Sequence, residues 1–144
     1  MLLLTLTACS GVKPQGLGLT NGNLAVCPDS PNCVNSLATD DVHAIAPMAL
    51  VGTPSSAEVI EKIKQALTEL PRLTIIEQTD VYLYAEAQTK IMRFVDDVEF
   101  VVNTDQGLIH VRSASRKGYK DFDVNRERIE TVRNLLLKQG TISR

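Results

Sequence analysis

The sequence predicts an α+β domain, in which one mainly antiparallel sheet of four to five strands has two helices packed on one face. Two segments repeat apolar residues at helical spacing, and four segments between them have the composition of strands. Short turns join these strands in pairs, and strands joined in this way pair antiparallel. Two amphipathic helices also need an apolar surface to cover, and one face of such a sheet provides it.

The N-terminus predicts a membrane anchor. The segment 6–9 reads Leu-Thr-Ala-Cys, which is typical of the cleavage site of a bacterial lipoprotein. We therefore expect residues 1–8 to be a residual signal peptide and Cys9 to carry lipid on its sulfur. A complete signal also has a positive n-region and about 7–15 apolar residues, which this segment lacks, so we expect the true start codon upstream. The alternative is an ordinary cytosolic N-terminus that is rich in leucine.

The anchor, if present, sets the location of the chain. Ser10 is not the aspartate-type residue that retains lipoproteins in the inner membrane, which favours the periplasmic face of the outer membrane of a bacterial cell envelope. Residues 9–26 are glycine-rich and are expected to be a lipidated, flexible tether. Residues 27–140 are expected to form a single domain, so the membrane is a partner only through the N-terminal lipid.

Two further cysteines support the same compartment. Cys27 and Cys33 enclose five residues that include two prolines. In an oxidising periplasm such a pair usually forms a disulfide, which for so small a loop stabilises by about 2–2.5 kcal/mol. A redox pair, a metal site and unpaired thiols remain as alternatives, although the spacing is not C-x-x-C.

The first half of the domain contains one clear helix and one strand pair. Ser55 and Glu58 form a capping-box pattern, apolar residues then recur at helical spacing, and Pro71 ends the run. Strands are expected over 73–78 and 81–87. A short strand is also expected around 42–45.

The second half contains a hairpin and a helix. Strands over 91–103 and 108–115 flank a turn that ends in Gly107. The register that keeps both faces consistent places Glu99 opposite Arg112. The last helix is expected over 124–139, with Asp123 or Asn125 as its N-cap and Gly140 after its end.

Composition excludes several classes of function. The net charge is −2 with 22% charged residues, so we expect no positive field that would attract nucleic acid or anionic lipid. No apolar run after Cys9 approaches the roughly 20 residues of a membrane span. No glycine-rich phosphate loop, nucleophile elbow or histidine–cysteine cluster is present, so we expect no cofactor and no metal.

The hairpin and the start of the last helix are more polar than a structural hairpin requires. Adjacent residues of a strand point to opposite faces, so Asp96 and Asp97 cannot act as a pair. Arginine and serine side chains near a helix N-terminus could bind an anion or polar ligand. Hydrogen bonds that only fix the loops are the alternative. The candidate ligand-binding residues are Asp96, Asp97, Glu99, Arg112, Ser113, Ser115, Arg116, Asn125 and Arg126.

Four motifs carry a resemblance to a known family. They are Cys-Pro-x-Ser-Pro-Asn-Cys, Phe-Val-Asp-Asp-Val-Glu-Phe, Val-Arg-Ser-Ala-Ser-Arg-x-Gly-Tyr and Asp-Phe-x-Val-Asn-Arg-x-Arg-Ile. Because the four motifs occur in this order, the chain resembles the uncharacterised bacterial and plant family called domain of unknown function fourteen ninety-nine. The resemblance extends from Cys27 to about Leu137. Many members look like lipoproteins or membrane-attached proteins, and the family pattern usually has Gly where this chain has Asp123. The resemblance implies no activity, substrate or catalytic residue.

These observations favour a non-enzymatic envelope lipoprotein that binds a small anionic or other polar ligand, or a partner protein, through the polar cluster. One alternative is a hydrolase or transferase that uses Asp96, Asp97 or Glu99 with Arg112 or Arg116. Another is a purely structural envelope protein. The sequence does not name the ligand or the oligomeric state.

Overall fold

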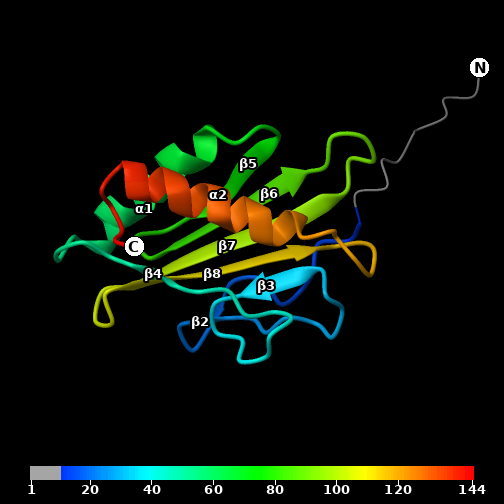
Figure 1. Cartoon of the computed structure of the whole chain (residues 1–144), viewed down its shortest axis with the longest axis horizontal. Coiled ribbons are helices and arrows are strands. Elements are labelled where there is room, and N and C mark those ends of the chain that lie inside the picture. The colour runs from blue at the N-terminus through cyan, green and yellow to red at the C-terminus, as the bar shows by residue number, and fades with distance from the viewer. Residues whose placement is uncertain (1–10) are drawn as a thin grey trace, which may run out of the picture.

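The computed structural model describes residues 11–144, so Cys9 and the expected signal peptide lie outside the described residues. Its larger sheet has six strands in the order β3-β8-β7-β6-β5, and β4 also pairs with β8. A second sheet contains only β1 and β2. Figure 1 shows the two helices lying across the larger sheet. The elements are β1 (Leu19–Thr20), β2 (Asn23–Leu24), β3 (Cys33–Asn35), β4 (Met48–Ala49), α1 (Ser56–Thr68), β5 (Leu73–Gln78), β6 (Tyr82–Gln88), β7 (Val95–Asn103), β8 (Leu108–Ser115) and α2 (Val124–Lys138).

The predicted fold class was wrong. Instead of one sheet of four to five strands with two helices on one face, residues 11–144 form eight strands in two sheets and are mostly β. The missed strands are two or three residues long, too short to show an alternating pattern. β3 and β4 exist because both add to the free edge of β8, where Cys33 pairs with Ala114 and Met48 with Ile109.

The strand expected around 42–45 is a turn. The Asp40 carboxylate accepts hydrogen bonds from the backbone N–H groups of Val42 and His43, and the Asp40 carbonyl accepts one from Ala44. These bonds curl the backbone, and only an isolated bridge joins Ala44 to Asn35. The nearest strand is β4, a few residues later.

Several local predictions were confirmed. Ser55 and Glu58 form a complete capping box at the start of α1. The β7–β8 register is the expected one, with Glu99 opposite Arg112 and Asn103 opposite Leu108. Cys27 and Cys33 form a disulfide. β7 begins later than expected, because a turn held by Thr89 and Phe94 occupies the start of the predicted strand.

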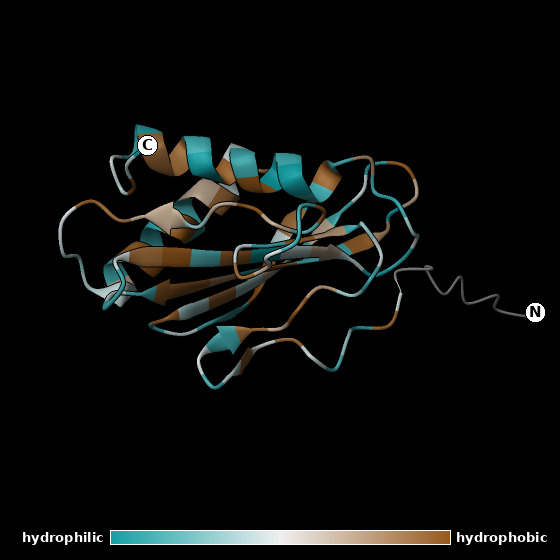
Figure 2. Ribbon diagram, turned by 60° about the horizontal axis from the view of Figure 1, so that its bottom comes forward, coloured by the Kyte–Doolittle hydropathy of each residue, from teal (hydrophilic) through white to brown (hydrophobic). Residues whose placement is uncertain are grey.

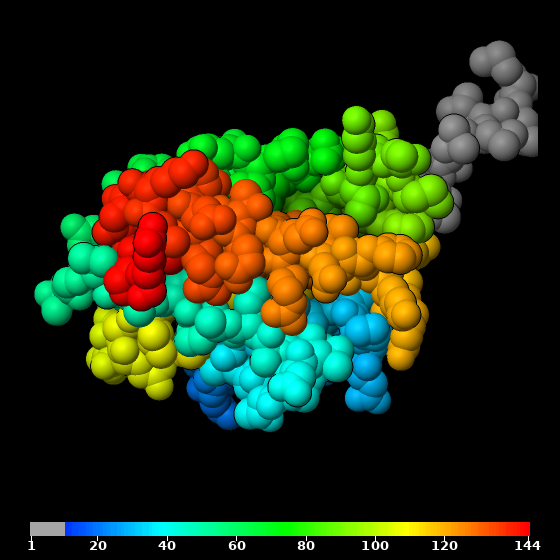
Figure 3. Space-filling view, viewed as in Figure 1, coloured from blue at the N-terminus to red at the C-terminus, as the bar shows by residue number. Residues whose placement is uncertain are grey.

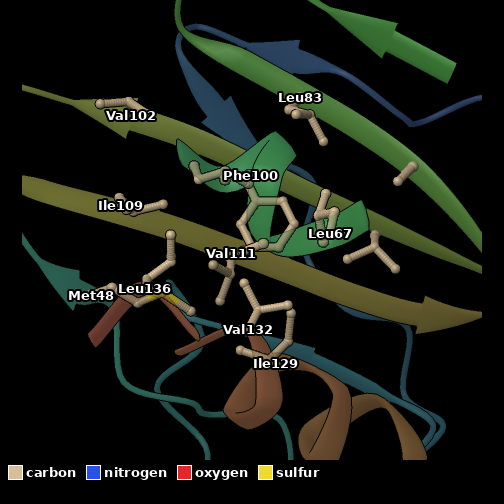
Figure 4. Close-up of a cluster of buried hydrophobic side chains, with 14 of the residues drawn as sticks. Met48, Leu67, Leu83, Phe100, Val102, Ile109, Val111, Ile129, Val132 and Leu136 are labelled. Carbon is tan, nitrogen blue, oxygen red and sulfur yellow. The ribbon is translucent and has the colours of Figure 1, made fainter. Parts of the chain in front are cut away.

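The main core lies between the helices and the sheet. Alternate residues of β7, Val98, Phe100 and Val102, point toward the helices and pack in this core. Figure 4 shows Phe100 and Val111 of the sheet close to Leu67 and to residues of α2. In Figure 2, brown apolar positions alternate with teal hydrophilic ones along α2, and brown positions also occur along the strands. Buried apolar residues of both helices fill this core. They are Val59, Ile60, Ile63, Ala66 and Leu67 of α1, and Ile129, Val132 and Leu136 of α2.

The opposite face of the sheet is covered by the N-terminal segment. Leu24 is buried against Tyr82, Tyr84 and Val101, and Leu17 packs beside them. Every residue from Val95 to Val102 is buried, because both faces of β7 are covered. Charged side chains of β7 are therefore enclosed whichever face they point to.

Candidate functional site

The β7–β8 hairpin divides the candidate residues between the two faces of the sheet. Asp96, Ser113 and Ser115 point toward α2. Their neighbours in the two strands point to the other face, because successive residues of a strand alternate between faces. Asp97, Glu99, Arg112 and Arg116 make their contacts on the face opposite the helices. The structure thus brings the candidates together as two separate groups.

On the helix face, Asp96 and Arg128 form a buried ion pair. Arg128 Nη2 lies 2.6 Å from Asp96 Oδ2. The other terminal nitrogen of Arg128 donates to Asn125 Oδ1 at 2.7 Å and to Ser113 Oγ at 3.1 Å. Asp96 is only 2% exposed, so these groups lie away from water. We call Asp96, Ser113, Ser115, Asn125 and Arg128 the helix-face network.

Asn125 is the centre of the helix-face network. Its Oδ1 accepts a hydrogen bond from Ser113 Oγ at 2.6 Å. Its Nδ2 donates to the Asn32 carbonyl at 3.1 Å, to Ser115 Oγ at 2.8 Å and to the Asp121 carboxylate at 2.7 Å. One buried amide therefore connects α2, β8 and the segment that follows the disulfide.

The start of α2 is capped by neither of the predicted residues. Asp123 occupies the N-cap position but its side chain caps nothing. The Asp121 carboxylate instead accepts hydrogen bonds from the backbone N–H groups of Asp123 and Asn125. Asp123 has a φ of 65°, in the left-handed region that glycine adopts most readily. This position is the one at which the family pattern usually has Gly. The helix terminus that could have bound an anion already holds a carboxylate.

On the opposite face, Arg116 and Asp97 form a second ion pair. Arg116 Nε donates to both Asp97 oxygens at 3.1 and 3.0 Å, and Nη2 donates to one of them at 2.7 Å. Arg116 also pairs with Glu86, and Tyr84 Oη donates to Asp97 at 2.7 Å. We call Tyr84, Glu86, Asp97 and Arg116 the outer network.

The outer network shifts the protonation equilibria of its members. The hydrogen bond to Asp97 is the main reason that the pKa of Arg116 is raised. Burial, followed by hydrogen bonds to Asp97 and Glu86, raises the pKa of Tyr84 well above its usual range. Burial alone would raise the pKa of Glu86, but hydrogen bonds from Arg116 and Tyr84 outweigh it and hold this pKa below its usual range.

Glu99 forms a third buried group with Arg112. Arg112 Nη1 lies 3.2 Å from one Glu99 oxygen. The other oxygen accepts hydrogen bonds from Tyr82 Oη at 2.7 Å and from the Gly18 backbone N–H at 2.8 Å. Burial and the contact with Glu99 raise the pKa of Tyr82 above its usual range. Within residues 11–144, Arg112 Nε is the one buried side-chain nitrogen or oxygen without a hydrogen-bond partner.

Arg126 belongs to none of these groups. It donates to the carbonyls of Ala44 and Val42, so it ties the loop before β4 to α2. The three buried carboxylates at 96, 97 and 99 each have an arginine partner. Removal of one partner would leave a buried charge unpaired, which is costly. Two of these pairs join β7 to β8 or to the residue after it, and the Asp96–Arg128 pair joins the hairpin to α2.

An open cavity lies at the end of the sheet where β6 leads into β7 and β8 leads into α2. It has a volume of about 390 Å³. The loops 89–94 and 117–124 form its two walls, and Asp96 and Ser115 also line it. In Figure 3 these loops, yellow-green and orange, lie side by side at one end of the molecule. We call this cavity the end cleft.

The end cleft combines apolar side chains with lysines. The apolar lining residues are Ile91, Met92, Phe94, Phe122 and Val124. Lys90, Lys117 and Lys120 also line the cavity, and none of them forms an ion pair with a residue in the range 11–144. The predicted position of a ligand pocket, between the hairpin end and the start of the last helix, therefore contains a cavity of different chemical character from the one expected.

Comparison with protein families identifies the chain. The family model described as protein of unknown function (DUF1499) matches residues 23–136. The chain belongs to this family. No curated protein matches the chain. The DUF1499 match includes both networks and the end cleft, whereas Gly18, which donates to Glu99, lies before it.

Sequence reasoning missed several members of the DUF1499 site. Arg128 and Asp121 lie in a motif that was recognised, but only the fold shows that they contact Asp96 and Asn125. Tyr84 and Glu86 alternate on β6 with apolar residues, and this alternation was a usable signal that they share the face of Asp97. The walls of the end cleft come from loops, which carry no periodic pattern.

Two kinds of feature are not found in the described part of this DUF1499 protein. Across residues 11–144, no three His, Cys, Asp or Glu side chains are placed to hold a metal ion. Neither α1 nor α2 is long and apolar enough to cross a bilayer.

Proposed function

We propose that this DUF1499 protein is a lipid-anchored protein of the cell envelope that binds an amphiphile, a molecule with an apolar chain and an anionic group, in the end cleft. The observation that carries the proposal is the composition of that cavity, which places Ile91, Met92 and Phe122 beside three lysines that form no ion pair within the described part of the chain. Ligand cavities usually have volumes of about 300–1,000 Å³ with mostly apolar walls and a few polar groups. The end cleft, at about 390 Å³, is within this range.

Two observations support the envelope location. The Leu-Thr-Ala-Cys segment at 6–9 is typical of lipoproteins. The Cys27–Cys33 disulfide is typical of proteins that fold in an oxidising compartment. Both are consistent with lipidation at Cys9, which mass spectrometry of the protein extracted from its native cells tests directly.

The polar cluster has an indirect role in this proposal. The outer network and the helix-face network hold the ends of β7 and β8, from which the walls of the end cleft leave. Asp96 and Ser115 connect the helix-face network to the cavity, because both line it. The remaining candidates do not line the end cleft, so in this proposal they position the site without touching the ligand; they are Asp97, Glu99, Arg112, Ser113, Arg116, Asn125 and Arg126.

A thermal-shift experiment with three probes tests the ligand class. Dodecyl phosphate has both the apolar chain and the anionic group of the proposed ligand. Ethyl phosphate has the anionic group without a long chain, and dodecanol has the chain without the anionic group. We expect dodecyl phosphate, below its critical micelle concentration, to raise the melting temperature of the protein more than either control probe. If ethyl phosphate alone gives the full shift, the ligand is polar and the amphiphile proposal is wrong.

A substitution that fills the cavity tests its location. Val124→Trp places a large side chain in the end cleft, and Val124 is 38% exposed, so folding should tolerate the change. We expect the dodecyl phosphate shift to disappear in this variant. Val51→Trp, at a valine that is 51% exposed and outside the end cleft, is the matched control and should keep the shift.

One observation favours an enzymatic alternative. Of the three carboxylates in β7, only Asp96 lines the end cleft, where it could act on a bound ligand. A hydrolase or transferase would then need Asp96 rather than Asp97 or Glu99. Turnover of a phosphate or carboxylate ester that Asp96→Asn abolishes, with binding preserved, would favour this alternative over simple binding.

A further inference from the structure

We infer that the loops around the end cleft form a surface that docks on a membrane containing anionic lipid. Four large apolar side chains project from these loops into solvent. Ile91 and Met92 are 86% and 63% exposed in one loop, and Tyr119 and Phe122 are 67% and 87% exposed in the other. Because exposed apolar residues scattered singly are normal, it is their concentration on two adjacent loops that requires an explanation. We call these four residues the apolar tips.

Charge identifies the kind of occupant. The loops that carry the apolar tips also carry Lys90, Arg93, Lys117 and Lys120. The net charge of −2 argues against attraction to anionic lipid, but it averages over the whole chain, and the cations of these two loops form a local excess. Apolar side chains that insert among acyl chains, surrounded by cations at the level of the headgroups, are the pattern of a surface that lies on an anionic bilayer.

The acidic residues of these loops, Asp121 and Asp123, do not reverse this charge, because two carboxylates against four cations leave a net charge of +2. The Asp121 carboxylate accepts hydrogen bonds from the backbone N–H groups of Asp123 and Asn125 and from the Asn125 side chain. Arg116, although adjacent to Lys117, is engaged by Asp97 and Glu86 and does not contribute a free charge. The lysines and Arg93 are therefore the groups available to phospholipid phosphates.

The direction of the chain supports the same orientation. A Cβ placed on Gly11, the first described residue, would lie 3.0 Å from Arg116 Cβ and 3.4 Å from Lys117 Cγ. The described chain thus begins beside the loops that carry the apolar tips. Two residues of chain reach at most about 7 Å, so lipid attached to Cys9 would enter the bilayer next to this surface.

This inference is independent of the ligand proposed for the end cleft, although the two share a location. A membrane contact would place the mouth of the cavity at the lipid surface. Val124→Trp separates the two proposals, because it fills the cavity and leaves the apolar tips and the lysines unchanged. We expect that variant to bind vesicles as the unmodified protein does.

Vesicle sedimentation tests the docking surface. The full chain with Cys9→Ser, which cannot be lipidated, is mixed with vesicles of phosphatidylcholine alone or with added phosphatidylglycerol. We expect stronger partitioning onto the anionic vesicles, and a loss of at least tenfold in Ile91→Ser/Phe122→Ser. Lys117→Ser/Lys120→Ser should lower partitioning at low ionic strength by about fivefold for each lysine, with little effect at high salt. The control variant Val42→Ser/Val51→Ser removes two exposed valines that lie outside the loops around the end cleft. It should partition onto the anionic vesicles as strongly as the Cys9→Ser chain does.

Fluorescence locates the contact on the molecule. The chain contains no tryptophan, so Phe122→Trp introduces a single reporter at an apolar tip. Its emission should shift to shorter wavelength on phosphatidylglycerol vesicles, whereas that of Val51→Trp should not. Equal shifts at both positions, or partitioning that is unchanged in Ile91→Ser/Phe122→Ser, would overturn the inference.

Discussion

Removal of Arg116 is the most direct test of how the outer network holds the sheet. Its guanidinium satisfies Asp97 through three hydrogen bonds of 2.7–3.1 Å, and Asp97 is 1% exposed. Arg116→Met keeps much of the apolar packing but leaves the Asp97 carboxylate buried with only Tyr84 as a hydrogen-bond donor from this group. Breaking a buried ion pair from one side costs about 3–5 kcal/mol.

That loss is large but leaves a measurable folded state. Domains of this size have free energies of unfolding of about 5–15 kcal/mol. At about 3–5 °C for each kcal/mol, the melting temperature should fall by about 9–25 °C. Urea titration followed by circular dichroism gives the change in the free energy of unfolding directly.

The matched control is an exposed ion pair. Lys64 lies 3.5 Å from Glu61 on α1, and both side chains are about half exposed. Lys64→Met removes the same charge from a helix position where Met is equally tolerated, so it should change the free energy of unfolding by less than about 1 kcal/mol. Asp97→Leu/Arg116→Met removes both buried charges and should be less destabilised than the sum of the two single changes. A loss below about 1 kcal/mol in Arg116→Met would refute the assignment of a structural role to this pair.

Two more predictions concern the networks. Asn125→Asp should lower the free energy of unfolding by at least about 3 kcal/mol, because the amide donor to Ser115 and Asp121 becomes a second carboxylate; a loss below about 1 kcal/mol in urea titration would contradict this. Glu86→Gln should flatten the fall of stability in acid. The pKa of Glu86 is held below its usual value of 4.5, so its contribution is complete above about pH 4.5 and disappears as the pH falls through the folded-state pKa. A profile of melting temperature against pH that keeps its shape in Glu86→Gln would show that the contact with Arg116 is not formed in solution.

The parts of the fold that the sequence predicts are those set by local chemistry. Ser55 and Glu58 cap α1 because a hydroxyl and a carboxylate three residues apart reach the free N–H groups of the first turn. The pairing of Glu99 with Arg112 follows from the alternation of side chains along two strands joined by a short turn. In both cases the partners are fixed by the spacing of a few residues.

The parts that were missed depend on contacts between distant segments. β3 and β4 form only because β8 offers a free edge, and no property of Cys33–Asn35 or Met48–Ala49 alone specifies this. Asp121 rather than Asp123 caps α2, because the turn places Asp123 in a left-handed conformation from which its side chain makes no cap. The fold class failed because four strands of two or three residues show no periodicity: β3 and β4 form on the edge of β8, and β1 and β2 pair only with each other.

The candidate site shows the same division. Alternation correctly placed Asp96 and Asp97 on opposite faces of the sheet, but it could not show that Arg128 of α2 pairs with Asp96. A purely apolar hairpin of similar volume would often be equally stable or more so. Stability alone therefore gives no reason for three buried ion pairs, whereas geometry gives one. Paired charges tolerate few arrangements, and the pairs at 96 and 97 occupy the end of the hairpin from which both walls of the end cleft leave. A network in that position fixes the distance between the two loops, so its substitution should weaken binding at the end cleft even where the domain remains folded.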